Sequence, residues 1–198
     1  MSFLPTARQI GKMCGVMHQI QYSQDAMLDG NLGEGEPIPD TRERILFLLN
    51  GKPGSRLEPD TVHKTEKFIR ENTELFDRIG AKSVLCHGDF RLGNIMLAKR
   101  QAYLIDFEFA FSGSPYYDMG YFFRNKSEKV QPLMKEPVQE AFADGYRETS
   151  PIPLPPDWLE LAKLCDICNM LCMLNHDTIP PEWVSEVESQ ILQTIRAR

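Results

Sequence analysis

A change of hydrophobic period in the middle of the chain constrains its fold more than any other feature. On both sides of this point, apolar residues recur mostly at three- and four-residue intervals, as they do on amphipathic helices. Between the two helical parts, residues 83–118 contain short apolar runs that are typical of strands. This order predicts a mostly α fold with a small β-hairpin insert (α+β), and it makes the loops of the insert the place for chemistry.

The expected boundaries follow from this periodicity and from the Gly and Pro residues that interrupt it. A short strand leading into a loop is expected over residues 83–89. A hairpin is expected over Ile95–Ala98 and Ala102–Phe107, with a tight turn at Lys99–Gln101. The stretch Asp29–Asp40, rich in Gly, Pro and acidic residues, is expected to be a loop. Helices are predicted over residues 6–22, 42–50, 59–79, 118–125, 130–148, 157–175 and 181–196.

The composition is that of a globular protein and excludes several classes of function. The 198 residues, 42% hydrophobic and 25% charged, correspond to one domain over residues 1–198. No apolar stretch approaches the ~20 residues that span a bilayer, and the N-terminus lacks a signal-peptide pattern, so neither a membrane partner nor secretion is expected. The five cysteines favour a reducing cytoplasm. The net charge of −6 argues against a nucleic-acid partner and is compatible with a cationic small substrate.

Three oxygen-bearing side chains have a spacing that suits phosphoryl transfer. In the string VLCHGDFRLGNIMLAKRQAYLIDFEF, Asn94 follows Asp89 by five residues and Asp106 ends a predicted strand. Phosphoryl transfer needs a carboxylate that accepts the hydroxyl proton, oxygen ligands for Mg²⁺ and a rigid frame. Asp89 can supply the first. Asn94 and Asp106 can supply the second, because the hairpin between them returns the chain and Mg²⁺ takes few protein oxygens.

These strings resemble those of the aminoglycoside phosphotransferase and choline kinase superfamily. HGDFRLGN matches the kinase catalytic-loop pattern H-x-D-x-x-x-x-N, and IDFE stands where protein kinases carry D-F-G. The downstream string EFAFSGSPYYDMGYFF and the early string MCGVMHQI are also similar to segments of that family. The resemblance implies the C-terminal lobe of a protein-kinase-like fold, with the catalytic and metal segment at residues 83–118.

The resemblance also implies a role for each of six residues. Asp89 is expected to be the catalytic base, and Asn94 and Asp106 to bind Mg²⁺ and thereby the nucleotide. His87 and Asp118 are expected to support the catalytic loop. Glu108 is expected to reach a second Mg²⁺ or the substrate. The implied reaction transfers the γ-phosphoryl group of ATP (or GTP) to a hydroxyl group of a small molecule, such as an amino sugar or amino alcohol.

Family members carry an N-terminal lobe whose strand Lys binds the α- and β-phosphates, and this lobe is expected to be absent here because only five residues precede Thr6. An isolated C-terminal lobe is expected to be inactive or nearly so. The alternative is a non-catalytic half-kinase that binds a ligand or partner. In that case two copies of the chain could form a homodimer through the face that an N-terminal lobe would cover, or this face could bind a separate N-terminal lobe.

Other interpretations of the same residues explain less of the sequence. A dinuclear-metal hydrolase could use His87, Asp89 and Asp106, but it leaves Asn94 unexplained. A zinc site is suggested by Cys165, Cys168, Cys172 and His176. On one helix the outer two of these cysteines would lie ~10 Å apart along the axis, too far for one zinc ion, so core packing is favoured. Core packing is also the favoured interpretation of His18. A quaternary-ammonium cage is conceivable for the aromatic residues, but core packing is favoured for most of them: Tyr116, Tyr117, Tyr121, Phe122 and Phe123.

Overall fold

The computed structural model describes residues 3–98, 101–124 and 134–197. Most of these residues are helical. The helices are α1 (Leu4–Met17), α2 (Thr41–Leu49), α3 (Pro59–Glu71), α4 (Thr73–Ile79), α5 (Tyr116–Phe123), α6 (Glu136–Thr149), α7 (Trp158–Met173) and α8 (Pro181–Arg196), with short 3₁₀ turns η1 (Gly54–Arg56) and η2 (Leu92–Asn94). The strands are β1 (Gln21–Tyr22), β2 (Ala26–Leu28), β3 (Glu34–Pro37), β4 (Ser83–Cys86), β5 (Ile95–Ala98), β6 (Gln101–Leu104) and β7 (Phe111–Gly113).

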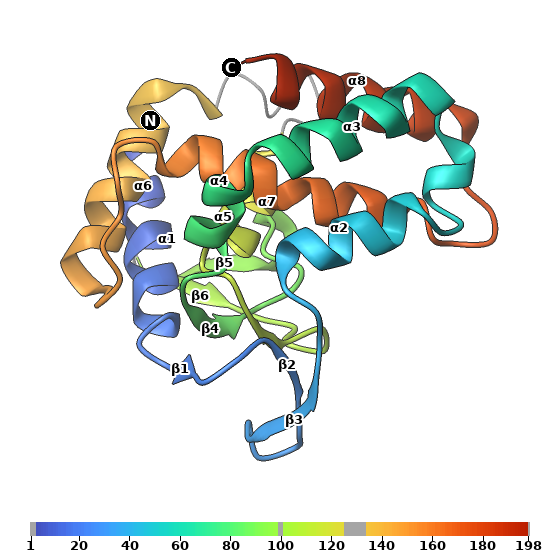
Figure 1. Cartoon of the computed structure of the whole chain (residues 1–198). Helices are drawn as coiled ribbons and strands as arrows, with labels where there is room; N and C mark the ends of the chain where they lie inside the picture. The colour runs from blue at the N-terminus through green and yellow to red at the C-terminus, as the bar shows by residue number, and fades with distance from the viewer. Residues whose placement is uncertain (1–2, 99–100, 125–133, 198) are drawn as a thin grey trace.

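The strands form two antiparallel sheets in the described part of the chain. The larger has five short strands in the order β1-β4-β7-β2-β3, and its centre is the pairing of Leu85 in β4 with Ser112 in β7. The smaller is a ribbon of β5 and β6. Figure 1 shows the larger sheet below the helices and α7 running across the middle of the helical part. The segment between β4 and α5, which contains the predicted chemistry, is thus held between a sheet and a helical core.

Helix α7 is the central helix because it is buried on nearly all sides. Helix α5 approaches it so closely that a Cβ on Gly120 would lie 2.2 Å from the carbonyl oxygen of Ala162. Only glycine at this position allows the contact. The close packing fixes α5 on the core, and α5 in turn carries the side chains that hold the candidate site.

A row of aromatic rings connects the predicted catalytic loop to this core. Phe90, which follows Asp89, is fully buried, and its ring centroid lies 5.5 Å from that of Phe122 in α5. Phe122 stacks on Phe142 of α6 at 5.7 Å, and Phe142 stacks on Trp158 of α7 at 5.9 Å. Aromatic pairs at such distances add to the free energy of burial. Phe122 therefore packs in the core, as do Tyr116, Tyr117 and Phe123, and His18 is fully buried against Tyr146.

The mostly α prediction is confirmed, but the β content was underestimated. The predicted helix 6–22 ends at Met17, because residues 21–22 pair with β4 as β1. The predicted loop 29–40 contains β3, which pairs with β2 and is exposed along its length, so it lacks the alternation that marks a strand. Strand β7 was not predicted, because its three residues are all buried and show no period.

Two further boundaries differ for local reasons. The predicted helix 59–79 is broken at Asn72, which leaves helical geometry and donates a side-chain hydrogen bond to the carbonyl of Phe68. The predicted strand 102–107 ends at Leu104, because the backbone turns at Asp106. The predicted helix 118–125 begins earlier, at Tyr116, and α6 begins at Glu136. Residues 130–133 of the range predicted for α6 lie outside the described residues, as do residues 99–100 of the predicted turn. Helix α8 matches its predicted bounds.

Candidate active site

Asp89 lies in the loop that follows β4, and the glycine before it shapes this loop. Gly88 has φ +81°, and a Cβ at this position would lie 2.2 Å from the carbonyl oxygen of Phe109. The left-handed backbone and the close approach both require glycine. The His-Gly-Asp string is therefore a structural requirement of the turn that brings Asp89 out of the sheet.

Asp118 holds this turn from the first turn of α5. Its fully buried carboxylate accepts the main-chain N–H of His87 at 2.7 Å and that of Gly88 at 3.1 Å. Burial raises the pKa of Asp118 to about 7, against the lowering effect of these two hydrogen bonds. A carboxyl group so placed fixes the backbone on which Asp89 sits.

His87 connects the loop to the segment that carries Asp106. Its Nδ1 accepts the main-chain N–H of Asp89 at 3.2 Å, so Nε2 bears the proton and donates to the carbonyl of Ile105 at 2.9 Å. The imidazole is fully buried and packs against the ring of Phe107 at 4.6 Å. Since both ring nitrogens have these partners, His87 is a structural link between the two predicted metal-binding segments.

Asn94 is bonded directly to Asp89. Its Nδ2 donates to the Asp89 main-chain oxygen at 3.0 Å and to Asp89 Oδ2 at 2.8 Å, and its own main-chain oxygen accepts the N–H of Ile105 at 3.0 Å. Both amide hydrogens are thereby used. Oδ1 accepts no hydrogen bond within the described residues, so this amide oxygen is available as a metal ligand.

Asp106 has an exposed carboxylate on a left-handed backbone, with φ +70°. A non-glycine residue in this conformation carries strain, and such residues gather at functional sites. The β5–β6 register pairs Ile95 with Leu104, so the chain returns beside Asn94 just before Asp106. An amide oxygen and a carboxylate are hard oxygen donors, and two such ligands suit Mg²⁺, which completes its shell with phosphate and water. The residues present fit this ion.

Glu108, the remaining predicted site residue, is exposed two positions after Asp106. Within the described residues its side chain makes no hydrogen bond or ion pair. The structure therefore joins Asp89, Asn94, His87 and Asp118 in one hydrogen-bonded group. Within the described residues, neither the Asp106 nor the Glu108 side chain bonds to this group.

Two residues near Asp89 were not predicted. Arg91 Nε lies 2.8 Å from Asp89 Oδ2, on a side chain that is 58% exposed. Burial, followed by interaction with Asp89, raises the pKa of Tyr121 in α5 to about 12. The sequence does hold a signal for each. Arg91 lies inside the loop motif. Tyr121 follows Asp118 by three positions, which places Tyr121 and Asp118 on one face of α5.

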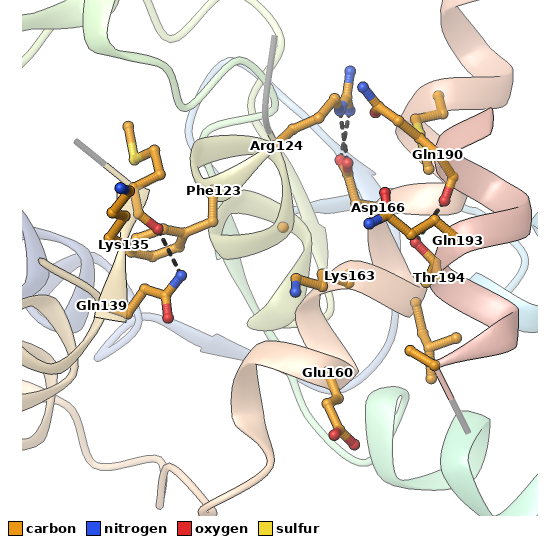
Figure 2. Close-up of a pocket in the computed structure, with 15 residues that line it drawn as sticks. Phe123, Arg124, Lys135, Gln139, Glu160, Lys163, Asp166, Gln190, Gln193 and Thr194 are labelled. Carbon is orange, nitrogen blue, oxygen red and sulfur yellow. Dashed lines mark hydrogen bonds and ion pairs between the residues drawn. The ribbon is translucent and has the colours of Figure 1, made fainter. Parts of the chain in front are cut away.

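A cavity of about 680 Å³ lies between α5, α6, α7 and α8 (Figure 2). Gln139, Lys163, Gln190 and Gln193 line it, and Arg124 at the end of α5 forms part of its wall. Arg124 Nε donates to Asp166 Oδ2 at 2.6 Å, and both side chains are about 5% exposed or less. The guanidinium also lies 4.6 Å from the centre of the Tyr121 ring.

The alternative metal sites are not found in the described residues. No group of three or more His, Cys, Asp and Glu side chains there is arranged to hold a metal ion, which argues against the dinuclear hydrolase and the zinc alternatives. Cys165 and Cys168 are buried in the core, as predicted. Among the described helices, none has the length and apolar character needed to span a membrane.

Known structures share this fold at low sequence identity. The chain matches a protein from Thermobifida fusca described as a fructosamine-3-kinase (18% identity, TM-score 0.69), a microcompartment-associated aminopropanol kinase (16%, 0.63) and the amicoumacin kinase hAmiN (14%, 0.57). Each match covers 98% of this chain but only 66%, 61% and 59% of the respective structure. The chain therefore spans less than two thirds of the length of these kinases.

No match was found among curated proteins. The model of the phosphotransferase enzyme family, APH, matches residues 6–152, which include the whole bonded group around Asp89. This match covers most of the chain and agrees with the similarity to fructosamine-type and amino-alcohol kinases. The chain belongs to the APH phosphotransferase family.

Proposed function

We propose that the chain is the catalytic lobe of a kinase that transfers the γ-phosphoryl group of ATP or GTP to a hydroxyl group of a small, amine-bearing molecule in the cytoplasm. The observation that carries the proposal is the pair formed by Asp89 and Asn94. Asn94 gives both Nδ2 hydrogens to Asp89 and keeps Oδ1 as an acceptor. The proton acceptor and one metal ligand are therefore held as a single unit, as phosphoryl transfer requires.

Each residue has a definite task in this proposal. Asp89 accepts the proton of the attacking hydroxyl group, while Asn94 and Asp106 hold the metal ion. Mg²⁺, when bound with the nucleotide, would supply charge neutralisation at the phosphates. His87 keeps the Asn94 and Asp106 segments in register through its bonds to Asp89 and Ile105. Asp118 keeps the loop backbone in place. Glu108 binds a second metal ion or the substrate.

The donor and acceptor classes rest on similar proteins and on charge. The amicoumacin kinase structure holds AMP-PNP and Ca²⁺, which supports a nucleotide and a divalent metal for this fold. The aminopropanol kinase acts, by its name, on an amino alcohol. The chain carries a net charge of −6, which favours a cationic acceptor such as an amino sugar or an amino alcohol.

We also propose that these 198 residues alone turn over nucleotide slowly. The described strands β1–β7 carry no lysine, whereas the family resemblance calls for a strand lysine on the α- and β-phosphates. Without it the triphosphate is poorly aligned, and alignment with charge neutralisation supplies most of the catalysis. We expect nucleotide affinity near millimolar, or about −4 kcal/mol.

The test is a radiolabelled phosphotransfer assay of the chain with ATP and GTP over a panel of amino sugars and amino alcohols. Asp89→Asn keeps the shape of the side chain but cannot accept the proton. It should therefore lower turnover by about 10²–10⁴ and leave nucleotide binding unchanged. Asp60→Asn, on the surface of α3, is the matched control and should retain full turnover. A loss of less than tenfold in Asp89→Asn would remove Asp89 from this role.

A second candidate, a non-catalytic pairing module, is favoured by one surface. We name it the ribbon surface, and it is the face of the β5–β6 ribbon that carries the exposed apolar side chains of Met96 and Tyr103. Met96 and Tyr103 are cross-strand partners and are 54% and 48% exposed. Apolar side chains clustered in this way mark an interaction surface. A pairing module predicts a dimer in sedimentation that Met96→Glu dissociates, together with no phosphotransfer by any variant.

A further inference from the structure

Arg91 lies between the proposed base and a proposed metal ligand, and the proposed function gives it no task. Its Nε lies 2.8 Å from Asp89 Oδ2, the same oxygen that accepts Nδ2 of Asn94. A Cβ at Gly93 would lie 3.9 Å from both Cζ and Nη1 of Arg91. The guanidinium therefore lies over the backbone of the catalytic loop, against the base and beside the residue next to Asn94.

The main chain fixes the direction in which this side chain leaves the loop. The N–H of Arg91 donates to the carbonyl of Asp89 at 3.0 Å, and the carbonyl of Arg91 accepts the N–H of Asn94 at 2.9 Å. Phe90, the preceding residue, is fully buried in the core, whereas Arg91 is exposed. The guanidinium thus stands on the open side of the loop, where a substrate has access to it.

The guanidinium has donors left for an anion. Arginine carries five N–H donors, and the hydrogen bond to Asp89 uses Nε alone. Within the described residues, no hydrogen bond involves Nη1 or Nη2 of Arg91. These two groups form a planar fork that matches two oxygens of a phosphoryl group. Because the side chain is 58% exposed, the fork can exchange water for phosphate without giving up a protein contact.

The phosphoryl group needs such a cation, and other cations near the site are already engaged. Arg124 is paired with Asp166 in the core, and the Arg44 guanidinium lies against the ring of Phe111, 5.4 Å from its centre. The described strands β1–β7 carry no lysine. Negative charge is spread over the three oxygens of the transferred group, so a cation beside them stabilises the transition state. Arg91 is placed to supply that charge.

We infer that Arg91 is a catalytic residue that bridges the base and the transferred phosphoryl group, with Nε on Asp89 and both Nη groups on the γ-phosphate oxygens of the nucleotide; this role rests on the proposed function. The bridge fixes the carboxylate relative to the phosphorus atom that the acceptor hydroxyl attacks. Arg91 keeps its own protons. The hydroxyl proton passes to Asp89, and the new O–P bond forms as the bond to the β-phosphate oxygen breaks and the nucleoside diphosphate leaves.

The first test compares nucleotides with and without a γ-phosphate and needs no turnover. Arg91→Met should raise the Kd of Mg²⁺·AMP-PNP, measured by NMR titration of the protein, by about 10-fold, because charge-assisted hydrogen bonds are lost. The Kd of Mg²⁺·ADP, which lacks the γ-phosphate, should stay as in the wild type. Arg70→Met, exposed on α3, removes the same charge and is the matched control, with both constants unchanged.

Two outcomes of this titration are contrary and have different meanings. An Arg91→Met variant that binds AMP-PNP as the wild type does, or that loses AMP-PNP and ADP binding equally, overturns the inference and leaves the proposed function standing. A wild type that binds neither nucleotide with Mg²⁺ refutes the proposed function, and the role of Arg91 with it.

The second test separates a bridge from a plain positive charge. Arg91→Lys keeps the charge, but its single ammonium group lacks the planar fork that holds carboxylate and phosphate in one fixed geometry. Its kcat in the phosphotransfer assay should fall by about 10-fold. The melting temperature should stay unchanged, because the side chain is exposed. A wild-type kcat in Arg91→Lys overturns the bridge, and absence of phosphotransfer in the wild type refutes the proposed function.

Discussion

The main-chain N–H of His87 donates to the carboxylate of Asp118 at 2.7 Å, although the two residues are 31 positions apart in the chain. This hydrogen bond joins the loop after β4 to the first turn of α5. It is also the reason that a fully buried carboxyl group is tolerated in the core, because a buried charge requires hydrogen-bond partners. The bond has a consequence for how stability depends on pH.

We predict that Asp118 and His18 give opposite pH slopes that nearly cancel. The pKa of Asp118 is raised from 3.8 to about 7 in the folded state, so its contribution to stability is present below pH ~4 and is lost as the pH rises to ~7. Burial lowers the pKa of His18 from 6.5 to about 3, so stability is lost as the pH falls from ~6.5 to ~3. The free energy of unfolding should therefore change little between pH ~4 and ~6.5.

The two single variants should separate these slopes. With the Asp118 contribution removed, Asp118→Asn should gain stability with rising pH in this window, by up to about 1.4 kcal/mol per pH unit. His18→Gln should lose stability with rising pH to a similar extent. Urea unfolding at several pH values measures both, and profiles parallel to that of the wild type in both variants would refute this assignment.

A methyl group at position 88 should destabilise the protein strongly. Gly88→Ala combines a left-handed backbone with a Cβ 2.2 Å from the Phe109 carbonyl oxygen, so we expect a loss of more than about 2 kcal/mol in the free energy of unfolding. Gly30→Ala is the matched control, because a Cβ there meets no atom within 4 Å. Similar unfolding midpoints for the two variants would contradict the described turn.

Removing only one partner of the buried ion pair between Arg124 and Asp166 should lower the free energy of unfolding strongly. Arg124→Met leaves Asp166 charged and buried, and we expect a loss of about 3–5 kcal/mol. The double variant Arg124→Met/Asp166→Leu should recover much of this loss, because no unpaired charge remains. Lys64→Met, which breaks an exposed pair with Asp60, should cost less than about 1 kcal/mol. A double variant no more stable than Arg124→Met would disprove this explanation.

The sequence predicted the parts of the fold that are local. Helix α8 and the β5–β6 hairpin were placed closely, because their periodicity and turns are contained within a few residues. In the larger sheet only β4 was predicted, because the sheet is made of strands of two to four residues from three regions of the chain. Gln21 pairs with Val84, and Ala26 pairs with Ser112. Such pairing is decided by tertiary contacts and leaves no periodic signal.

The candidate site, too, could be predicted from the sequence only where the signal is local. The spacing of Asp89, Asn94 and Asp106 and the resemblance to a known family predict that Asn94 and Asp106 hold the metal ion, and this stays a prediction. Tyr121 is among the aromatic residues predicted mostly to pack in the core, but the structure leaves it only half-buried. Arg91 is only two positions after Asp89 in the sequence, but its ion pair with Asp89 depends on the turn at Gly88.

The most direct test of the central claim is calorimetric titration of the chain with AMP-PNP, with and without Mg²⁺. Two protein oxygens alone hold Mg²⁺ weakly, so binding of metal and nucleotide should depend on each other. We predict Mg²⁺-dependent AMP-PNP binding in the wild type and in Asp89→Asn, and its loss in Asp106→Ala. If Asp106→Ala binds Mg²⁺ and AMP-PNP as the wild type does, the metal site is not at Asp106 and the proposed catalytic site is wrong.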